Sequence, residues 1–366
     1  MNRSRCNEAA GPSAVDATAK MALEVIESFG VPCGQVSSAR NGHAEQAHMM
    51  TRNWANQYGL LGDPHRQEMF DQLRYADMLA YGCTTAPPER LALFAQWFTY
   101  YFLLDDQQDL AVLTGRTEDF VALQKDLHYV FHSRGVDGSA RTRNFSAAVA
   151  DLCRCTAPHV SDEWWDRYVS HADEVFAAQR AENVLRLTGT FPDPEEFKVI
   201  RRRAGAADMV FDIIEACEGM EIPESIRYGS ACSRYADDLN DFTTWTNDVL
   251  GVDHDAANGD PNNYVLIREH AGGLDRRTAI ETVTAEIVEL VANLPIRRED
   301  VRRSIGKFSV PQQIRIERSL DAWFDWAMNV PIHYMRAHGR LAQMDRARPG
   351  EPPAFTEDLL NRRSTA

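Results

Sequence analysis

The sequence predicts an all-α fold, and three observations lead to that prediction. From Met49 onward, apolar residues recur at i, i+3 and i+4 spacing through most of the chain. Proline followed by acidic residues marks several helix starts, as in the segments that begin at Pro87 and Asp193. No segment shows the sustained alternation of apolar and polar residues that is typical of a half-buried strand. We therefore expect a single domain of many long helices.

The expected helices follow one another with short connections. They cover residues 65–81, 87–104, 117–134, 139–153, 161–187, 194–217, 223–250, 276–293, 297–305 and 311–338. Residues 1–45 are rich in Ala, Gly and Ser, and we expect them to form a flexible lead-in. Residues 343–366 are expected to be a flexible tail, which leaves residues 46–342 as the helical domain.

Composition limits the classes of function. The chain has 44% hydrophobic and 25% charged residues, as expected of a globular protein with a large core. Its 54 acidic and 39 basic residues give a net charge of -15, which argues against a nucleic acid or an anionic membrane as the main partner. Seven scattered cysteines indicate neither a disulfide framework nor a zinc site. We expect a cytoplasmic protein with no membrane span and no signal peptide.

The apolar, aromatic-rich run at 91–104 leads directly into a cluster of carboxylates. Asp105, Asp106 and Asp109 form a DDxxD pattern there, where we expect the helix to end. Residues three and four apart share a helix face, so these side chains can direct oxygen atoms toward one point. Oxygen ligands suit Mg²⁺ far better than Zn²⁺. Carboxylates are also common on solvated helix ends, so the interpretation depends on a second ligand set.

A second segment with many oxygen-bearing side chains lies about 140 residues further on, at 236–263. Two sets of three residues in it have the i, i+4, i+8 spacing that places them on one helix face. One set keeps an oxygen atom on every side chain, whereas the other has glycine in the middle. The sets are Asn240, Thr244 and Asp248, and Asn247, Gly251 and Asp255. The spacing alone leaves both open.

With these motifs in this order, the chain resembles a class I terpene synthase of the bacterial type. That family pairs a DDxxD on one helix with an NDxxSxxxE on another, and together they hold three Mg²⁺ ions that bind a prenyl diphosphate. The resemblance covers roughly residues 50–340. It implies a single-domain helical bundle around a central pocket, with both metal motifs at the mouth of the pocket.

The family's spacing favours the second of the two sets. In the family a short link leads from the acidic ligand to a Gly-Asp-x-x-Asn segment, and Asp255 stands at that distance from Gly259. The diphosphate-sensing arginine lies about 46 residues before the asparagine, which is the separation of Arg201 and Asn247. The resemblance therefore implies the metal ligands Asp105, Asp109, Asn247, Gly251 through a water molecule, and Asp255. It leaves Asp106 as a salt-bridging neighbour.

Further substrate contacts are implied by the same resemblance. Gly205 matches a helix-break glycine whose carbonyl is proposed to help trigger ionisation. His254 stands in place of a usual lysine. Tyr334 corresponds to the tyrosine of an Arg-Tyr pair, although His333 replaces the arginine and the pair is displaced by one residue relative to Trp326.

Three aromatic residues lie one or two helical turns before Asp105. We expect Phe98, Tyr101 and Phe102 to line the pocket, where aromatic faces stabilise a carbocation by on the order of 1 to 2 kcal/mol. Ordinary core packing is the alternative for each of them.

Three functions compete at this point. The resemblance implies a Mg²⁺-dependent cyclase that ionises a linear prenyl diphosphate, with farnesyl diphosphate ahead of geranylgeranyl and geranyl diphosphate, and forms a hydrocarbon or alcohol. A chain-elongating prenyltransferase shares the fold but requires an aspartate-rich second motif, and the second motif of this chain does not have that pattern. A helical binding protein without catalysis is the third alternative, suggested by Gly251 and His333. Either a monomer or a homodimer is compatible with the sequence.

Overall fold

The prediction of an all-α fold is confirmed. The computed structural model describes residues 39–136, 143–334, 348–353 and 355–361. Within these ranges the chain forms helices and no strand. Most of the expected lead-in, residues 1–38, lies outside the described residues, as does the segment 335–347. No helix in the described ranges is long and apolar enough to cross a membrane.

The helices are connected by short loops and turns. With a 3₁₀ turn at Ala157–His159, they are α2 (Ala44–Gln57), α3 (Pro64–Leu73), α4 (Tyr75–Ala80), α5 (Pro88–Leu113), α6 (Thr117–His132), α7 (Asn144–Thr156), α8 (Asp162–Thr188), α9 (Pro194–Ala204), α10 (Ala207–Glu218), α11 (Glu224–Arg227), α12 (Ser230–Ala257), α13 (Tyr264–Gly272), α14 (Arg276–Ser304) and α15 (Val310–Tyr334).

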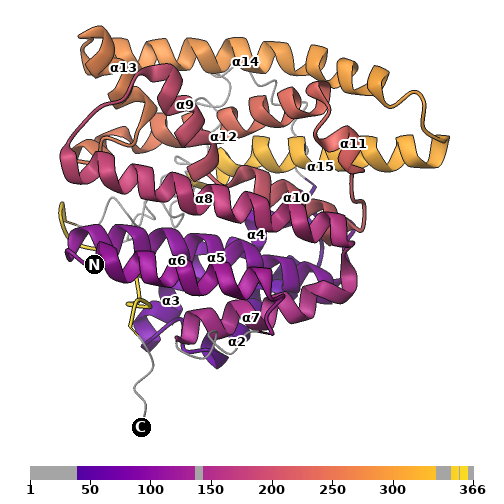
Figure 1. Ribbon diagram of the computed structural model, residues 1–366, viewed down its shortest axis with the longest axis horizontal. Coiled ribbons are helices and arrows are strands. Elements are labelled where there is room, and N and C mark those ends of the chain that lie inside the picture. The colour runs from indigo at the N-terminus through magenta and orange to yellow at the C-terminus, as the bar shows by residue number, and fades with distance from the viewer. Residues whose placement is uncertain (1–38, 137–142, 335–347, 354, 362–366) are drawn as a thin grey trace, which may run out of the picture.

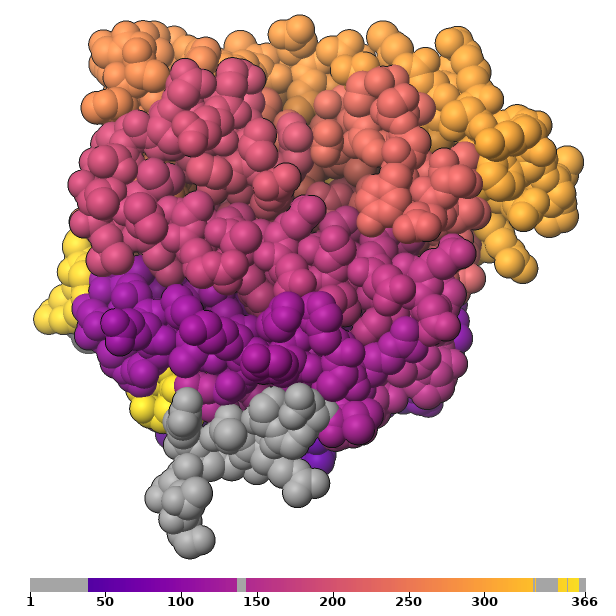
Figure 2. Space-filling model, in the orientation of Figure 1, coloured from indigo at the N-terminus to yellow at the C-terminus, as the bar shows by residue number. Residues whose placement is uncertain are grey.

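Helices α5 and α12 organise the two sides of the bundle. Helix α5 packs against α2, α4, α6, α7, α8 and α10. Helix α12 contacts α9, α10, α13, α14 and α15, and in Figure 1 this second group occupies the upper part of the molecule. Figure 2 shows the same face in space-filling form, where α6, α8 and α14 lie one above another from bottom to top.

Helix α5 continues beyond Leu104, where the sequence analysis placed its end, to Leu113. The additional turns are fixed by the buried side chain of Gln107. Its Nε2 donates to the carbonyl oxygen of Glu357 (2.8 Å), and its Oε1 accepts from the N–H of Leu359 (2.8 Å). Such tertiary contacts supply most of the stability of helices in proteins. The DDxxD pattern therefore lies inside a helix and not at its end.

Residues 355–361, part of the segment 343–366 expected to be a flexible tail, pack on the helices. The apolar side chains of Phe355, Leu359 and Leu360 are buried against the bundle. Their burial offsets the conformational entropy that is lost when this segment becomes ordered. The composition of this segment could not show that other helices provide a surface on which it packs.

Three helices that we expected to be continuous are broken. The helix expected over 65–81 breaks at Arg74, and the one expected over 194–217 breaks at Gly205 and Ala206. The helix expected over 223–250 breaks at Tyr228 and Gly229. Arg74 and Ala206 take positive φ angles of 54° and 57°. This backbone region is strained for residues other than glycine, so tertiary packing must maintain it. The second break lies beside the cavity described below.

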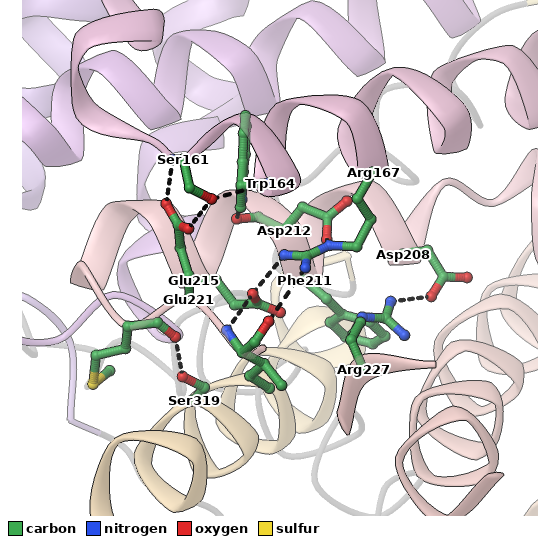
Figure 3. Close-up of polar contacts among 12 residues, drawn as sticks. Ser161, Trp164, Arg167, Asp208, Phe211, Asp212, Glu215, Glu221, Arg227 and Ser319 are labelled. Atoms are coloured by element: carbon green, nitrogen blue, oxygen red, sulfur yellow. Dashed lines mark hydrogen bonds and ion pairs between the residues drawn. The ribbon is translucent and has the colours of Figure 1, made fainter. Parts of the chain in front are cut away.

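A buried ionic network ties α8 to α10. Arg167 lies between two carboxylates (Figure 3), with its Nε 2.7 Å from Asp212 Oδ1 and its Nη2 2.7 Å from Glu215 Oε2. The second oxygen of Asp212 is 2.7 Å from His171 Nδ1. Burial opposes ionisation of Asp212, but Arg167, His171 and Arg227 together outweigh it and lower the pKa of Asp212 to about 2. The network holds together the helices that form one wall of the cavity.

Candidate active site

A cavity with an apolar half and a polar half lies between α5, α8, α9, α10, α12 and α15. The apolar half is lined mainly by aromatic and aliphatic side chains, among them Phe98, Tyr101, Phe102, Val210, Trp326 and Val330. The polar half is lined among others by Asp109, Glu182, Arg186, His254, Asp255 and Asp260. Asp105, Arg201, Ala204 and Asn247 line both halves, so the two are continuous.

The three aromatic residues that we expected to line the pocket do so. Phe98 packs edge to face against Phe102 (ring centroids 5.2 Å apart) and against Trp326 (6.2 Å). The hydroxyl of Tyr101 is 2.8 Å from the hydroxyl of Tyr168, a buried neighbour outside the cavity lining. Away from Asp105 and Arg201, which lie where the two halves join, the π faces and this fixed phenol line the apolar half with groups that carry no formal charge.

The first carboxylate motif divides between the cavity and the core. Asp105 and Asp109, one turn apart on α5, line the polar half. Asp106 is buried and is absent from the lining of either half. The geometry thus brings the two expected ligands together and leaves Asp106 as a packed neighbour.

Arg201 leaves the last turn of α9 and reaches across to α12. Its Nη2 lies 2.7 Å from Asp248 Oδ1 and 3.2 Å from Asn247 Oδ1. Burial disfavours the charge of the guanidinium, but the carboxylates of Asp248, Glu182 and Asp255, with Asp248 first, together outweigh this effect and raise the pKa of Arg201. Arg201 is therefore a fixed positive charge at the junction of the polar and apolar halves.

The two candidate sets on α12 have different surroundings. Asn247 and Asp255 line the same polar half as Asp105 and Asp109. In the other set, the Nδ2 of buried Asn240 donates to the carbonyl oxygen of Arg202 (3.0 Å). The hydroxyl of Thr244 donates to the carbonyl oxygen of Asn240 (2.9 Å).

The third member of that set is also engaged. Asp248 is buried, pairs with Arg201, and accepts the backbone N–H of Tyr264 through Oδ2 (2.9 Å). Asp255 instead faces the cavity and accepts from Asn263 Nδ2 (2.8 Å). Burial, followed by the nearby carboxylate of Asp260, raises the pKa of Asp255 to about 8. A cation beside Asp255 would relieve this crowding of negative charge.

Gly205 is required by the close approach of α12. A Cβ at this position would lie 2.2 Å from Thr244 Cγ2, well inside van der Waals contact. Gly205 lies one turn after Arg201 and lines the apolar half of the cavity. At Gly251 the situation differs, since a Cβ there would lie 3.6 Å from Asp255 Oδ2, an ordinary contact distance.

Of the remaining predicted residues, the structure places His254 in the cavity but does not describe the side chain of Tyr334. His254 lines the polar half, with its Nε2 3.1 Å from Asn258 Nδ2. Tyr334 is the last residue of α15, and its side chain lies outside the described residues. His333 beside it is buried, with its Nε2 2.9 Å from the carbonyl oxygen of Leu73. This histidine therefore anchors α15 to α3.

Arg186 on α8 belongs to the site although its sequence position did not indicate this. Its Nη1 lies 2.7 Å from Asp109 Oδ1, and its Nη2 pairs with Asp260 in the loop after α12. The guanidinium thus joins the first motif to the Gly-Asp-x-x-Asn segment. Glu182, one turn earlier, also lines the polar half, and burial raises its pKa to about 7. Within α8 these two residues look like ordinary surface positions, and only contacts between helices reveal them.

The comparison with known proteins agrees with this geometry. Residues 96–293 match the family described as terpene synthase family 2, C-terminal metal binding. A (-)-delta-cadinene synthase from Streptomyces clavuligerus is 29% identical over 81% of this chain and 92% of that protein. A (+)-T-muurolol synthase from Roseiflexus castenholzii, described as cyclizing (2E,6E)-farnesyl diphosphate, is 30% identical over 63% of this chain and 70% of that protein.

Solved structures give the same result for the fold. The crystal structure of an α-eudesmol synthase superposes with a TM-score of 0.73 at 17% identity, covering 82% of this chain and 97% of that chain. A linalool/nerolidol synthase from Streptomyces clavuligerus gives 0.71 at 21% identity, covering 80% and 98%. The fold and the site define a class I terpene synthase. The chain belongs to terpene synthase family 2.

Proposed function

We propose that this terpene synthase ionises farnesyl diphosphate in a Mg²⁺-dependent reaction and cyclises the carbocation to a terpene hydrocarbon or alcohol. One observation carries the proposal: a mouth lined by carboxylates and arginines opens directly into an aromatic cavity. The choice of substrate is supported by relatives. The T-muurolol synthase and a 4-epi-cubebol synthase from Streptosporangium roseum are both described as cyclizing farnesyl diphosphate.

The donor atoms at the mouth fit a hard divalent cation. Asp105, Asp109, Asn247 and Asp255 offer oxygen atoms, which Mg²⁺ prefers. We infer that these residues hold three Mg²⁺ ions together with the diphosphate, and that water replaces the side-chain oxygen missing at Gly251. Bound Mg²⁺ neutralises charge on the departing diphosphate.

Arg201 and Gly205 act at the point where the bond breaks. The carbon–oxygen bond to the diphosphate breaks heterolytically, so the electron pair leaves with the diphosphate and the cation stays in the cavity. Arg201, held by Asp248, places a preorganised positive charge at the junction of the two halves. His254 and Tyr334 are proposed as further contacts of the diphosphate, and the Gly205 carbonyl as a contact of the ionising carbon.

The apolar half protects the cation once it has formed. Phe98, Tyr101 and Phe102 present aromatic surface to it, and the surrounding apolar side chains exclude bulk water. The reaction ends when the cation loses a proton to give a hydrocarbon, or when it captures one water molecule and the resulting oxonium ion loses a proton to give an alcohol. A cytoplasmic location remains a prediction from the sequence, which is compatible with either a monomer or a homodimer.

Product analysis tests this function. Purified protein is incubated separately with geranyl, farnesyl and geranylgeranyl diphosphate, with Mg²⁺ and with EDTA, and volatile products are identified by gas chromatography and mass spectrometry. We expect cyclic C15 products from farnesyl diphosphate that disappear with EDTA. Linear products longer than the substrate, formed when isopentenyl diphosphate is added, would instead indicate the prenyltransferase. Absence of both product and diphosphate release would support the binding protein.

A further inference from the structure

A second group of potential metal ligands lies on the surface formed by α6 and α8. His128 and His132 are one turn apart on α6, and Asp173 faces them from α8. One ligand atom from each side chain lies within 4.8 Å of the other two. The three side chains are 45%, 48% and 40% exposed, so an ion can reach them from solvent. None of them lines the cavity described above.

The distances fit a small ion after minor side-chain movement. His128 Nδ1 is 2.8 Å from Asp173 Oδ1, and His132 Nε2 is 3.7 Å from Asp173 Oδ2. Ligands at 2.0 to 2.2 Å from a tetrahedral ion are about 3.3 to 3.6 Å apart. The two observed separations lie on either side of that range. Partly exposed side chains on rigid helices can make such small adjustments without moving the backbone.

The orientation of His132 favours metal binding. Its Nδ1 lies 3.0 Å from the carbonyl oxygen of His128, one turn earlier. A carbonyl oxygen can only accept a hydrogen bond, so in the neutral ring the proton is on Nδ1 and the lone pair is on Nε2. That lone pair is on the nitrogen nearer Asp173. Histidines that bind metals usually have their other ring nitrogen fixed by such a hydrogen bond.

We propose that His128, His132 and Asp173 bind a divalent transition ion, represented by Zn²⁺. Two imidazole nitrogens and one carboxylate, with a remaining position for water, suit Zn²⁺ and its neighbours in the series, whereas Mg²⁺ requires oxygen ligands. The ion would link α6 to α8, the helix that carries Glu182 and Arg186 to the polar half of the cavity. This proposal is independent of the proposed cyclase function.

Calorimetric titration of the metal-free protein with Zn²⁺, in the presence of excess Mg²⁺, tests the site. We expect a single site with a micromolar dissociation constant for Zn²⁺. Its affinity should fall at least about tenfold in His132→Ala and in Asp173→Asn. His159→Ala, which removes an exposed histidine from the turn after α7, is the matched control and should leave the affinity unchanged. Equal Zn²⁺ affinity in the wild type, His132→Ala and Asp173→Asn, or no binding at all, would overturn the proposal.

Thermal denaturation provides a second readout. At a hundredfold excess over its dissociation constant, Zn²⁺ should raise the Tm of the wild type by roughly 2 to 5 °C. The Tm of His132→Gln, which keeps the size and helical preference of the position, should not change with Zn²⁺. A similar Zn²⁺-induced rise in this variant would contradict the assignment, whatever the result for His132→Ala.

Discussion

Arg201 on α9 and Asp248 on α12 form a buried ion pair, with Nη2 of the arginine 2.7 Å from Oδ1 of the aspartate. The Nε of Arg201 donates to both oxygens of the same carboxylate, at 2.9 and 3.1 Å. Asp248 therefore already has a cationic partner, while the adjacent Asn247 lines the cavity. This difference supports Asn247 and Asp255 as metal ligands and assigns Asp248 to positioning Arg201.

The first prediction distinguishes the two candidate sets on α12. Asn247→Ala and Asp255→Ala should abolish turnover, because each removes an oxygen ligand that faces the polar half. Thr244→Val should keep turnover within about threefold of the wild type, because the Thr244 hydroxyl bonds only to its own helix. Steady-state release of diphosphate measures all three variants.

Two further variants complete this comparison. Gly251→Ser should remain active, since a Cβ there meets nothing closer than 3.6 Å. Asp253→Asn on the same helix, whose side chain is 90% exposed, is the control for loss of a carboxylate. Loss of turnover in Thr244→Val with normal turnover in Asn247→Ala would favour the other set.

The second prediction concerns the first motif. Asp105→Asn should lower turnover at least about a hundredfold, because it removes a charged ligand from the junction of the two halves. Asp119→Asn, at the exposed start of α6, is the matched control. Near-normal turnover of Asp105→Asn at saturating Mg²⁺ would show that the motif is only a charged helix surface.

The third prediction tests the contact between Gly205 and Thr244. Gly205→Ala should destabilise the protein by about 1 to 3 kcal/mol and reduce turnover, because the new methyl group overlaps Thr244 Cγ2. Thr244→Ser removes that methyl group and should restore most of the stability in the double variant. Urea denaturation measures both effects. Additive effects of the two substitutions, without rescue, would be inconsistent with this contact.

The fourth prediction concerns Arg186, which bridges Asp109 and Asp260. Arg186→Met removes a positive charge from the mouth, so the KM for the diphosphate substrate should rise about tenfold or more. The half-saturating Mg²⁺ concentration should fall, because the two carboxylates lose a competing cation. Arg277→Met, at an 89% exposed position, is the control. Unchanged values of both constants would mean that Arg186 has no role at the mouth.

The fifth prediction is about stability. Arg167→Met should lower the free energy of unfolding by roughly 3 to 5 kcal/mol, because the buried carboxylates of Asp212 and Glu215 lose their common partner. Chemical denaturation at neutral pH measures the change. A loss below about 1 kcal/mol would show that the network is replaceable by apolar packing.

Much of the fold was predictable, because helix periodicity and proline starts are local signals. The helix expected from residue 194 begins at Pro194, and that expected from residue 117 begins at Thr117. Signals were weaker where tertiary contacts decide the structure. Helix α13, the break at Arg74 and the continuation of α5 to Leu113 were not predicted, since each depends on neighbours distant in sequence.

In the candidate site, too, residues with a sequence signal could be predicted, whereas those brought together only by tertiary contacts could not. Asp105 was located from its DDxxD pattern, and Arg201 and Asn247 from the resemblance to the family; the structure brings all three to one cavity. Arg186 and Asp260 were not identified as a pair, because their contact crosses between α8 and a loop. His128 and His132 were not singled out in the sequence, and Asp173 joins them only through the packing of α6 on α8.

A crystal structure of the protein with Mg²⁺ and inorganic diphosphate would show directly which residues of α12 bind the metal. We expect ions bound by Asp105 and by Asn247 and Asp255, with the diphosphate beside Arg201 and a water molecule as the ligand at Gly251. Ions bound by Asn240, Thr244 and Asp248, with Arg201 displaced from Asp248, would contradict this expectation.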